Sequence, residues 1–122
     1  MTYKHATAAF AFIILSSCAA PAVEKPEYKR TVLFENEEVM VVEVRFAPGA
    51  ISPLHTHRYP GRVIYVLSGG VLEFTPEGGK PRSAQVVAGK ASWFPKESHA
   101  IRNVGDAEVR AVEIEIKNVG PR

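Results

Sequence analysis

Apolar and polar residues alternate in short runs along most of the chain after residue 28, and turn residues separate the runs. The clearest run is 39–46, where every second side chain from Met40 to Phe46 is apolar while Glu43 and Arg45 share the opposite face. A period of two predicts a β-strand with one buried face.

The same pattern predicts strands throughout, and no segment has a helical period. We expect strands at 29–34, 39–46, 62–67, 71–75, 83–87, 91–94, 99–104 and 109–117, with the segment before residue 62 also extended. Pro95 should end the strand at 91–94, because proline lacks the N–H that a ladder needs. In the last strand, Glu113 and Glu115 are expected on a solvated face. Eight or nine short strands predict an all-β sandwich or small barrel.

Composition narrows the classes of function. With 122 residues, the chain has room for one domain, and its formal net charge of +2 argues against nucleic acid as a partner. The single cysteine excludes an intramolecular disulfide. No apolar run is long enough to span a bilayer.

The first residues are typical of a secretory leader. Lys4 precedes the apolar run 8–15, and small residues follow, so we expect a signal peptide over 1–17. The sequence 15–18, Leu-Ser-Ser-Cys, resembles the bacterial lipobox, which implies lipidation of Cys18, a tether over 18–27 and a domain over 28–118. The alternatives are a short N-terminal helix of the domain, or ordinary cleavage after Ala20 without a lipid.

The lipobox resemblance also implies a location. A lipid on Cys18 would hold the protein at a membrane surface on the periplasmic side of the bacterial cell envelope. In lipoproteins of this kind, a residue such as Ala19 after the cysteine favours the outer membrane. Without the lipid, the protein would be soluble in the periplasm or secreted.

Histidines supply the candidate chemistry. His55 and His57 are two residues apart, so both point to one face of an extended strand and form half of a metal site. A third histidine, His99, lies far along the chain, and the fourth, His5, falls in the expected leader.

The two histidine segments resemble the cupin superfamily. Its first motif is matched by four residues, Gly49, His55, His57 and Gly69, and its second by Gly89, Pro95, His99 and Asn103. The resemblance implies a double-stranded β-helix, or jelly-roll barrel, with the three histidines at the positions of metal ligands. It also implies a divalent transition metal (Fe, Zn, Ni, Cu or Mn) as cofactor.

Two positions depart from these motifs. Arg62 stands where the family has a glutamate ligand, and the second motif is one residue short, with Glu97 where a glycine is usual. By strand parity, Arg62 should point into the barrel, where its planar guanidinium could clamp a carboxylate, with Arg58 as a further candidate. The alternative is a surface side chain that leaves through the barrel mouth. Glu97 is a candidate replacement carboxylate.

The leading interpretation is therefore a metal-binding cupin that acts on or binds a small anionic molecule through His55, His57 and His99, with Arg62 as the catalytic or clamping residue. If it is an enzyme, the resemblance allows a dioxygenase, an isomerase or a lyase, and the residues favour none of these. The alternative is a metal-free cupin that binds or senses a sugar or an organic acid.

A homodimer is also expected. Val63, Tyr65 and Leu67 are apolar, as are Ile64 and Val66 on the opposite face of the same strand. A strand that is apolar on both faces needs cover on both, and a second protomer would supply it.

Overall fold

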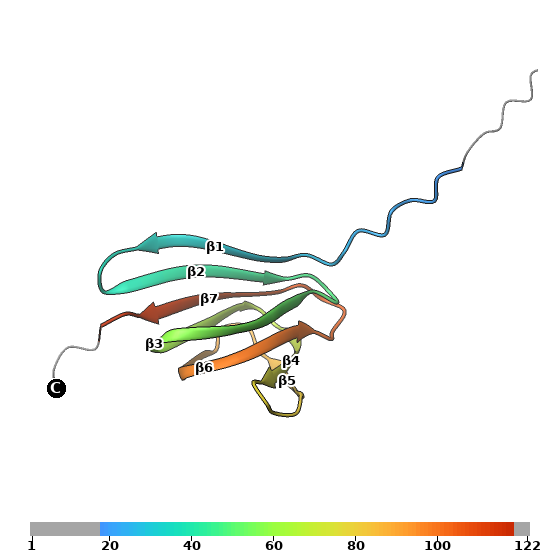
Figure 1. Ribbon diagram of the computed structural model, residues 1–122. Helices are drawn as coiled ribbons and strands as arrows, with labels where there is room; N and C mark the ends of the chain where they lie inside the picture. The colour runs from blue at the N-terminus through green and yellow to red at the C-terminus, as the bar shows by residue number, and fades with distance from the viewer. Residues whose placement is uncertain (1–17, 119–122) are drawn as a thin grey trace, which may run out of the picture.

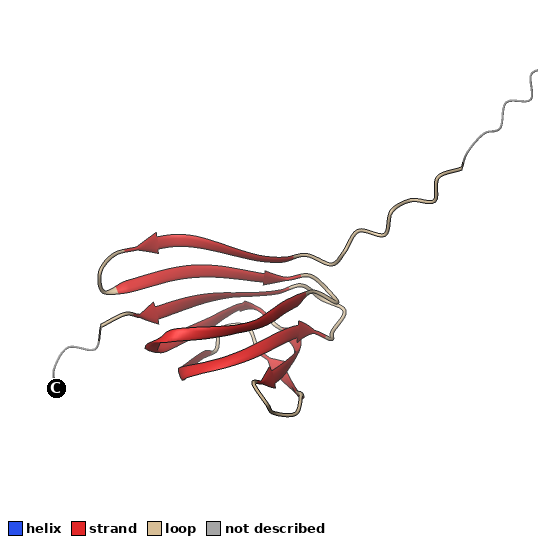
Figure 2. Ribbon diagram, viewed as in Figure 1, coloured by secondary structure: helices blue, strands red, loops and turns tan. Residues whose placement is uncertain are grey.

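The protein is described here from a computed structural model covering residues 18–118, and within this range it contains strands and no helix (Figure 2). The seven strands are β1 (Tyr28–Glu35), β2 (Val39–Phe46), β3 (Ile51–Ser68), β4 (Gly70–Pro76), β5 (Arg82–Val86), β6 (Ala91–Asn103) and β7 (Val109–Ile116). The all-β prediction is confirmed.

The strands form one antiparallel sheet in the order β1-β2-β7-β3-β6-β4-β5. The sheet is curved, with the β4–β5 hairpin below β3 and β6 (Figure 1). This is a jelly-roll arrangement. Its two long strands, β3 and β6, pair with each other from Ile51–Arg102 to Tyr65–Ala91, so the two histidine segments run side by side.

The core lies at one end of this sheet. It consists of the buried apolar side chains Val42, Val44, Phe46, Ala50, Leu72, Ile101, Val109 and Ala111. Full burial of a valine such as Val42 contributes about 1.5–3 kcal/mol of transfer free energy.

Asn103 fastens this end of the sheet. Its amide group donates to the carbonyl oxygens of Phe46 and Ala107, both at 2.8 Å, and its Oδ1 accepts from the N–H of Gly105 at 2.9 Å. The side chain is fully buried. The asparagine of the second motif therefore has a structural role.

Two of the predicted gaps between strands are absent, so residues 18–118 contain seven strands rather than the eight or nine expected. The extended histidine segment and the predicted strand 62–67 are one strand, β3, and Pro95 lies inside β6 rather than at its end. Proline is tolerated there because the β4–β6 ladder ends at Pro76–His99, which leaves β6 only β3 as a ladder partner at Pro95.

The N-terminal predictions fall largely outside the described residues. The expected signal peptide, 1–17, is not covered, and Cys18 is the first described residue and is exposed. Residues 18–27 are exposed and form no strand or helix, and they lead away from the sheet (Figure 1). Residues 18–118 contain no helix long and apolar enough to cross a membrane.

Candidate metal centre

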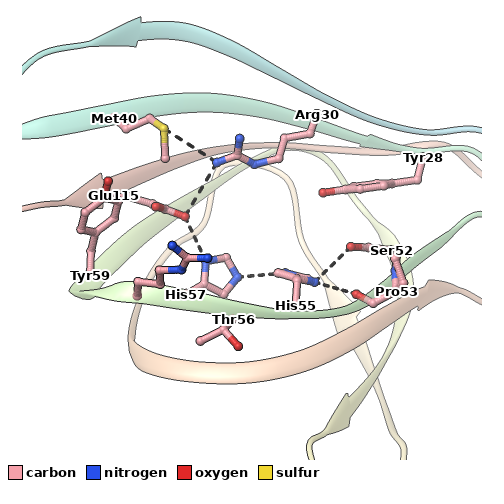
Figure 3. A pocket seen from close by; sticks show the side chains of 11 residues that line it. Tyr28, Arg30, Met40, Ser52, Pro53, His55, Thr56, His57, Tyr59 and Glu115 are labelled. Atoms are coloured by element: carbon pink, nitrogen blue, oxygen red, sulfur yellow. Dashed lines mark hydrogen bonds and ion pairs between the residues drawn. The ribbon is translucent and has the colours of Figure 1, made fainter.

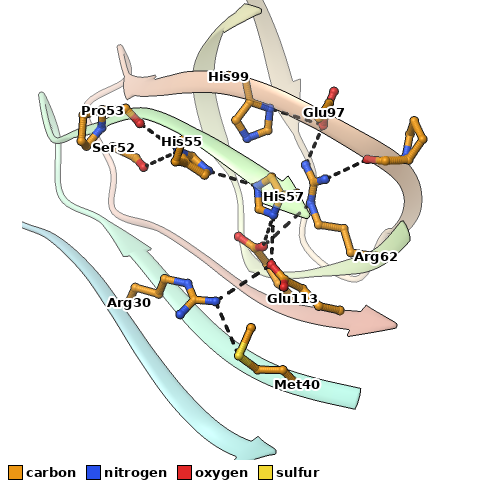
Figure 4. Close-up of polar contacts among 12 residues, drawn as sticks. Arg30, Met40, Ser52, Pro53, His55, His57, Arg62, Glu97, His99 and Glu113 are labelled. Atoms are coloured by element: carbon orange, nitrogen blue, oxygen red, sulfur yellow. Dashed lines mark hydrogen bonds and ion pairs between the residues drawn. The ribbon is translucent and has the colours of Figure 1, made fainter. Parts of the chain in front are cut away.

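Strands β3 and β6 bring the three predicted histidines together. His55 is the ladder partner of His99, and His57 lies two residues further along the same face. Each ring offers one nitrogen, and these atoms all lie within 4.8 Å of one another. The ring centroids are 4.8, 4.8 and 5.1 Å apart, with the rings nearly edge-to-face (Figure 4).

An oxygen lies beside the Nδ1 atom of every ring. His55 Nδ1 donates to the Pro53 carbonyl at 2.8 Å, and His57 Nδ1 donates to Glu115 Oε1 at 3.0 Å. His99 Nδ1 lies 3.3 Å from Glu97 Oε1. A carbonyl or carboxylate oxygen accepts and does not donate, so the hydrogen bonds of His55 and His57 place a proton on Nδ1 and leave a lone pair on Nε2 of these two rings.

Two of the Nε2 atoms face each other, and the third has no partner among the described residues. His55 Nε2 and His57 Nε2 are 3.0 Å apart, and His99 Nε2 is buried with no hydrogen-bond partner in the described part of the chain. Two lone pairs at 3.0 Å repel unless a proton or a cation lies between them. Oriented, unpaired imidazole nitrogens of this kind fit a metal ion.

Burial disfavours a second proton on the buried rings, which leaves a metal ion as the better partner for their nitrogens. Removal from water lowers the pKa of His57, although the hydrogen bond to Glu115 acts in the opposite direction. Burial also lowers the pKa of His99 to about 4; the nearby Glu97 carboxylate acts in the opposite direction, and the Arg62 guanidinium adds to the lowering. Without a metal, the rings of His57 and His99 are therefore neutral at pH 7.

Arg62 points into the barrel, as strand parity predicts, and is 2% exposed. Its Nη2 donates to Glu97 Oε1 at 2.6 Å and its Nη1 to the Pro95 carbonyl at 3.2 Å, while its Nε lies 3.8 Å from Glu113 Oε2 (Figure 4). The alternative of a surface side chain is wrong. A ligand carboxylate would have to compete with Glu97 for this guanidinium.

Sequence reasoning missed two carboxylates. Glu113 and Glu115 were expected on a solvated face, but they are 8% and 6% exposed and point inward beside His57, with which they form a second group of possible metal-ligand atoms. The strand register explains this: Glu115 pairs with Arg62 across the β3–β7 ladder, so the two share a face. A buried arginine requires carboxylates nearby, so the expectation that Arg62 points inward could have indicated that glutamates of a neighbouring strand also point inward.

Two cavities reach the histidine cluster from different sides. One, of about 530 Å³, lies against His55 and His57 (Figure 3); its lining residues are Tyr28, Arg30, Met40, Ser52, Pro53, His55, Thr56, His57, Arg58, Tyr59 and Glu115. The other, of about 430 Å³, lies against His99 and Glu97 and is walled mainly by apolar residues of β4, β5 and β6. A molecule in either cavity would therefore lie beside the histidines.

Comparison with known proteins agrees with this geometry. A family model described as a cupin domain matches residues 42–115. The chain belongs to the cupin superfamily. This cupin is 42% identical over 95 residues to the beta-alanine degradation protein BauB of Pseudomonas aeruginosa, a match that covers 76% of this chain and 97% of the relative.

Solved structures resemble this cupin as well. A cupin domain from Bordetella pertussis shares 32% identity with a TM-score of 0.71, covering 80% of this chain and 100% of that one. A double-stranded β-helix protein from Klebsiella pneumoniae shares 24% identity with a TM-score of 0.62, covering 80% of this chain and 84% of that one. The second likeness concerns the fold alone.

Cupins commonly bind a metal, and the donor set of this one fits that property. Three imidazole nitrogens suit Fe, Zn, Ni or Cu, and Mn where carboxylates assist, so the residues support a divalent transition metal without selecting its identity.

Proposed function

We propose that this cupin binds a divalent transition metal through His55, His57 and His99 and uses it to bind or transform a small anionic molecule. The observation that carries the proposal is the orientation of the rings. His55 and His57 donate from Nδ1 to oxygen acceptors, so their Nε2 lone pairs face each other at 3.0 Å, and the buried Nε2 of His99 has no hydrogen-bond partner within residues 18–118. Ring orientation of this kind is what outer-sphere acceptors provide to metal ligands.

The residues around the centre have distinct tasks in this proposal. Glu115 and the Pro53 carbonyl fix the tautomers of His57 and His55, and the second cavity places mainly apolar residues beside His99. A bound divalent ion would supply Lewis-acid polarisation of a ligand oxygen or a site for oxygen chemistry. Dioxygenase, isomerase and lyase activities remain candidates, with β-alanine and related small acids as first probes because of the name of the Pseudomonas relative.

Metal analysis of the purified protein tests the proposal. We expect close to one ion per chain after incubation with each candidate metal, and loss of that ion when His55 and His57 are both replaced by alanine. Thr56→Ala is the matched control, because Thr56 lies between the two histidines and bonds Ser98 rather than the rings. If the wild-type protein holds no metal after exposure to iron, zinc, nickel, copper and manganese, the proposal fails.

A metal-free binding protein is the second candidate, and one contact favours it. If His55, rather than the more deeply buried His57, carried a second proton, the 3.0 Å approach of His55 Nε2 and His57 Nε2 would be an ordinary hydrogen bond that needs no ion. In that case, organic acids or sugars should raise the melting temperature of the metal-free protein. Added metals should leave it unchanged.

We also propose that Cys18 carries the lipid anchor and that the domain lies on the periplasmic side of the cell envelope. The support is the Leu-Ser-Ser-Cys sequence and the exposed, strand-free segment that follows it. Detergent phase partitioning of cell extracts tests this: the full-length protein should enter the detergent phase, and Cys18→Ala should remain in water. A wild-type protein found only in the aqueous phase would contradict the proposal.

A further inference from the structure

The cavity beside His55 and His57 has an excess of positive charge. Two arginines line it, Arg30 and Arg58, against one carboxylate, Glu115. Glu115 already accepts a hydrogen bond from His57 Nδ1 at 3.0 Å. The cavity therefore favours an anion even before a metal adds to its charge.

Neither arginine of this cavity donates a hydrogen bond to an oxygen within residues 18–118, and Arg30 is the one that approaches the carboxylate of Glu115. Arg30 lies on β1, whose one sheet neighbour is β2, and its side chain reaches across the cavity toward Glu115 (Figure 3). Its contacts are loose: Nη2 lies 3.9 Å from Glu115 Oε1 and 3.9 Å from Met40 Sδ. Within residues 18–118, no oxygen accepts a hydrogen bond from Arg30.

Other arginines show how a satisfied guanidinium looks in this protein. Arg62 meets Glu97 at 2.6 Å, and Arg110 meets Glu43 at 2.6 Å. Arg30, by contrast, presents its planar array of N–H groups to a cavity, with a side chain 38% exposed and able to adjust. Such an array matches the two oxygens of a carboxylate.

Neutral groups complete the surroundings of Arg30. The hydroxyls of Tyr28 and Ser52 line the same cavity, and the Tyr28 ring is fixed by packing on Phe46 at 4.8 Å between centroids. A volume of about 530 Å³ lies within the usual range for small-molecule sites. The cavity thus combines one cationic end, neutral donors and the histidine cluster.

The second cavity is less suited to an anion. Its lining holds one arginine, Arg82, and one carboxylate, Glu97, so it has no excess of positive charge, and its walls include Phe74 and Phe94. Glu97 would repel a ligand carboxylate that approached His99 from this side. The distribution of charge therefore selects the cavity of Arg30.

We propose that Arg30 binds the carboxylate of a small organic acid in the cavity beside His55 and His57, taking the clamping role that the sequence suggested for Arg62. This inference rests on the proposed function, since it assigns the ligand class of the same site. It makes Arg30 a specificity-determining residue, because a neutral or cationic molecule of the same length would lack the charged partner.

Calorimetric titration of the full protein with three probes of equal length tests the inference. Propionate should bind to the wild-type protein, whereas propanamide and propylamine should not. Arg30→Gln should weaken propionate binding about tenfold to a hundredfold, the range expected for loss of a charged hydrogen-bonding partner. Arg82→Gln, in the other cavity, is the matched control and should bind propionate as tightly as the wild type.

Metal content measured on the same samples separates this inference from the proposed function. Arg30→Gln should retain the metal, and Arg30→Lys should bind propionate better than Arg30→Gln does because it keeps the charge. Equal propionate binding by wild type and Arg30→Gln overturns the inference, as does a wild type that binds propionate no better than propanamide. Arg30-dependent binding of propionate to a protein without metal supports the inference while the metal proposal falls.

Discussion

At the scale of single residues, two charged side chains at motif positions distinguish this cupin, one on β3 and one on β6. A guanidinium, Arg62, stands where the family motif has a carboxylate, and Glu97 on β6 supplies the carboxylate instead. Arg62 is 2% exposed, so its charge requires a partner at close range. Glu97 provides that partner at 2.6 Å and also lies 3.3 Å from His99 Nδ1, which links the substitution to the histidine cluster.

Removal of Glu97 should therefore destabilise the fold. We expect Glu97→Ala to lower the free energy of unfolding of the metal-free protein by about 2–4 kcal/mol, because it leaves the Arg62 guanidinium buried without its nearest carboxylate. Urea unfolding measures this change. Glu35→Ala, which removes an exposed partner of Lys117, should have a much smaller effect.

The double variant distinguishes a pair effect from two separate ones. Arg62→Met combined with Glu97→Ala should cost less than the sum of the single changes, since neither charge is then left alone. Additive effects would show that Arg62 and Glu97 are not coupled.

Acid should destabilise the metal-free protein through His99. Burial lowers its folded-state pKa to about 4, from 6.5 in an unfolded chain. Between these values the unfolded chain holds a proton that the folded protein lacks, so the free energy of unfolding is highest above pH 6.5 and falls as the pH drops toward 4. The slope from this one group approaches about 1.4 kcal/mol per pH unit. Urea midpoints across this range measure it, and a slope unchanged in His99→Gln would contradict this origin.

At the scale of elements, alternation alone predicted most of the strands. β2 spans 39–46 as predicted, because its apolar face is complete and turn residues flank it. β3 and β6 are longer than predicted, because proline and glycine signals report local backbone preference and not the ladder beside them. Pro95 and Gly61 are paired with each other across β3 and β6, where a register shift between His57 and Gly61 accommodates extra residues of β3.

The face of β7 could not be predicted from its own pattern. Val112, Ile114 and Ile116 alternate with Glu113 and Glu115, and an isolated strand of this kind would bury the apolar set. The sheet instead places the glutamates inside. The interior holds His57 and Arg62, which pair with carboxylates, and on the opposite face the apolar set of β7 lies among apolar residues of the neighbouring strands. The three candidate ligand histidines were predictable because they fall in a motif, whereas the pairing of Glu115 with His57 and the approach of Arg30 to Glu115 are visible only in the folded chain.

Glu115 on β7 should control the affinity of the centre for its metal. Glu115→Gln keeps an acceptor near His57 Nδ1 but removes the charge that orients and polarises the ring, so we expect metal affinity about 10–100-fold lower. Competition with a chromophoric chelator measures the dissociation constant. Glu43→Gln, on the opposite face of the sheet and paired with Arg110, should leave it unchanged. Equal affinity in Glu115→Gln and wild type would remove Glu115 from the site.

At the scale of the whole molecule, the face of the sheet opposite the histidines, its outer face, carries a continuous apolar row. We define this outer face by one row of ladder partners that crosses five strands, together with Tyr65 beside it; the row is Phe34, Val41, Ile114, Val63 and Trp93. Phe34 is 54% and Trp93 57% exposed, and no charged side chain interrupts the row. Contiguous exposed apolar surface of this kind marks an interaction site.

We predict that a second copy of the chain covers this outer face. In a two-fold dimer the same patch meets itself, so an uncharged apolar row is complementary to its own copy without a matching set of charges. Tyr65→Glu should then shift the mass measured by light scattering from dimer to monomer, because each interface would bury two carboxylates near its axis.

Leu54→Glu is the matched control: Leu54 is similarly exposed but lies outside the row, so this variant should remain dimeric. A monomeric wild type, or a dimer broken by Leu54→Glu and not by Tyr65→Glu, would place the interface elsewhere or remove it. The site would be unaffected in either case, since Arg30, the three histidines and Arg62 belong to the opposite, concave face.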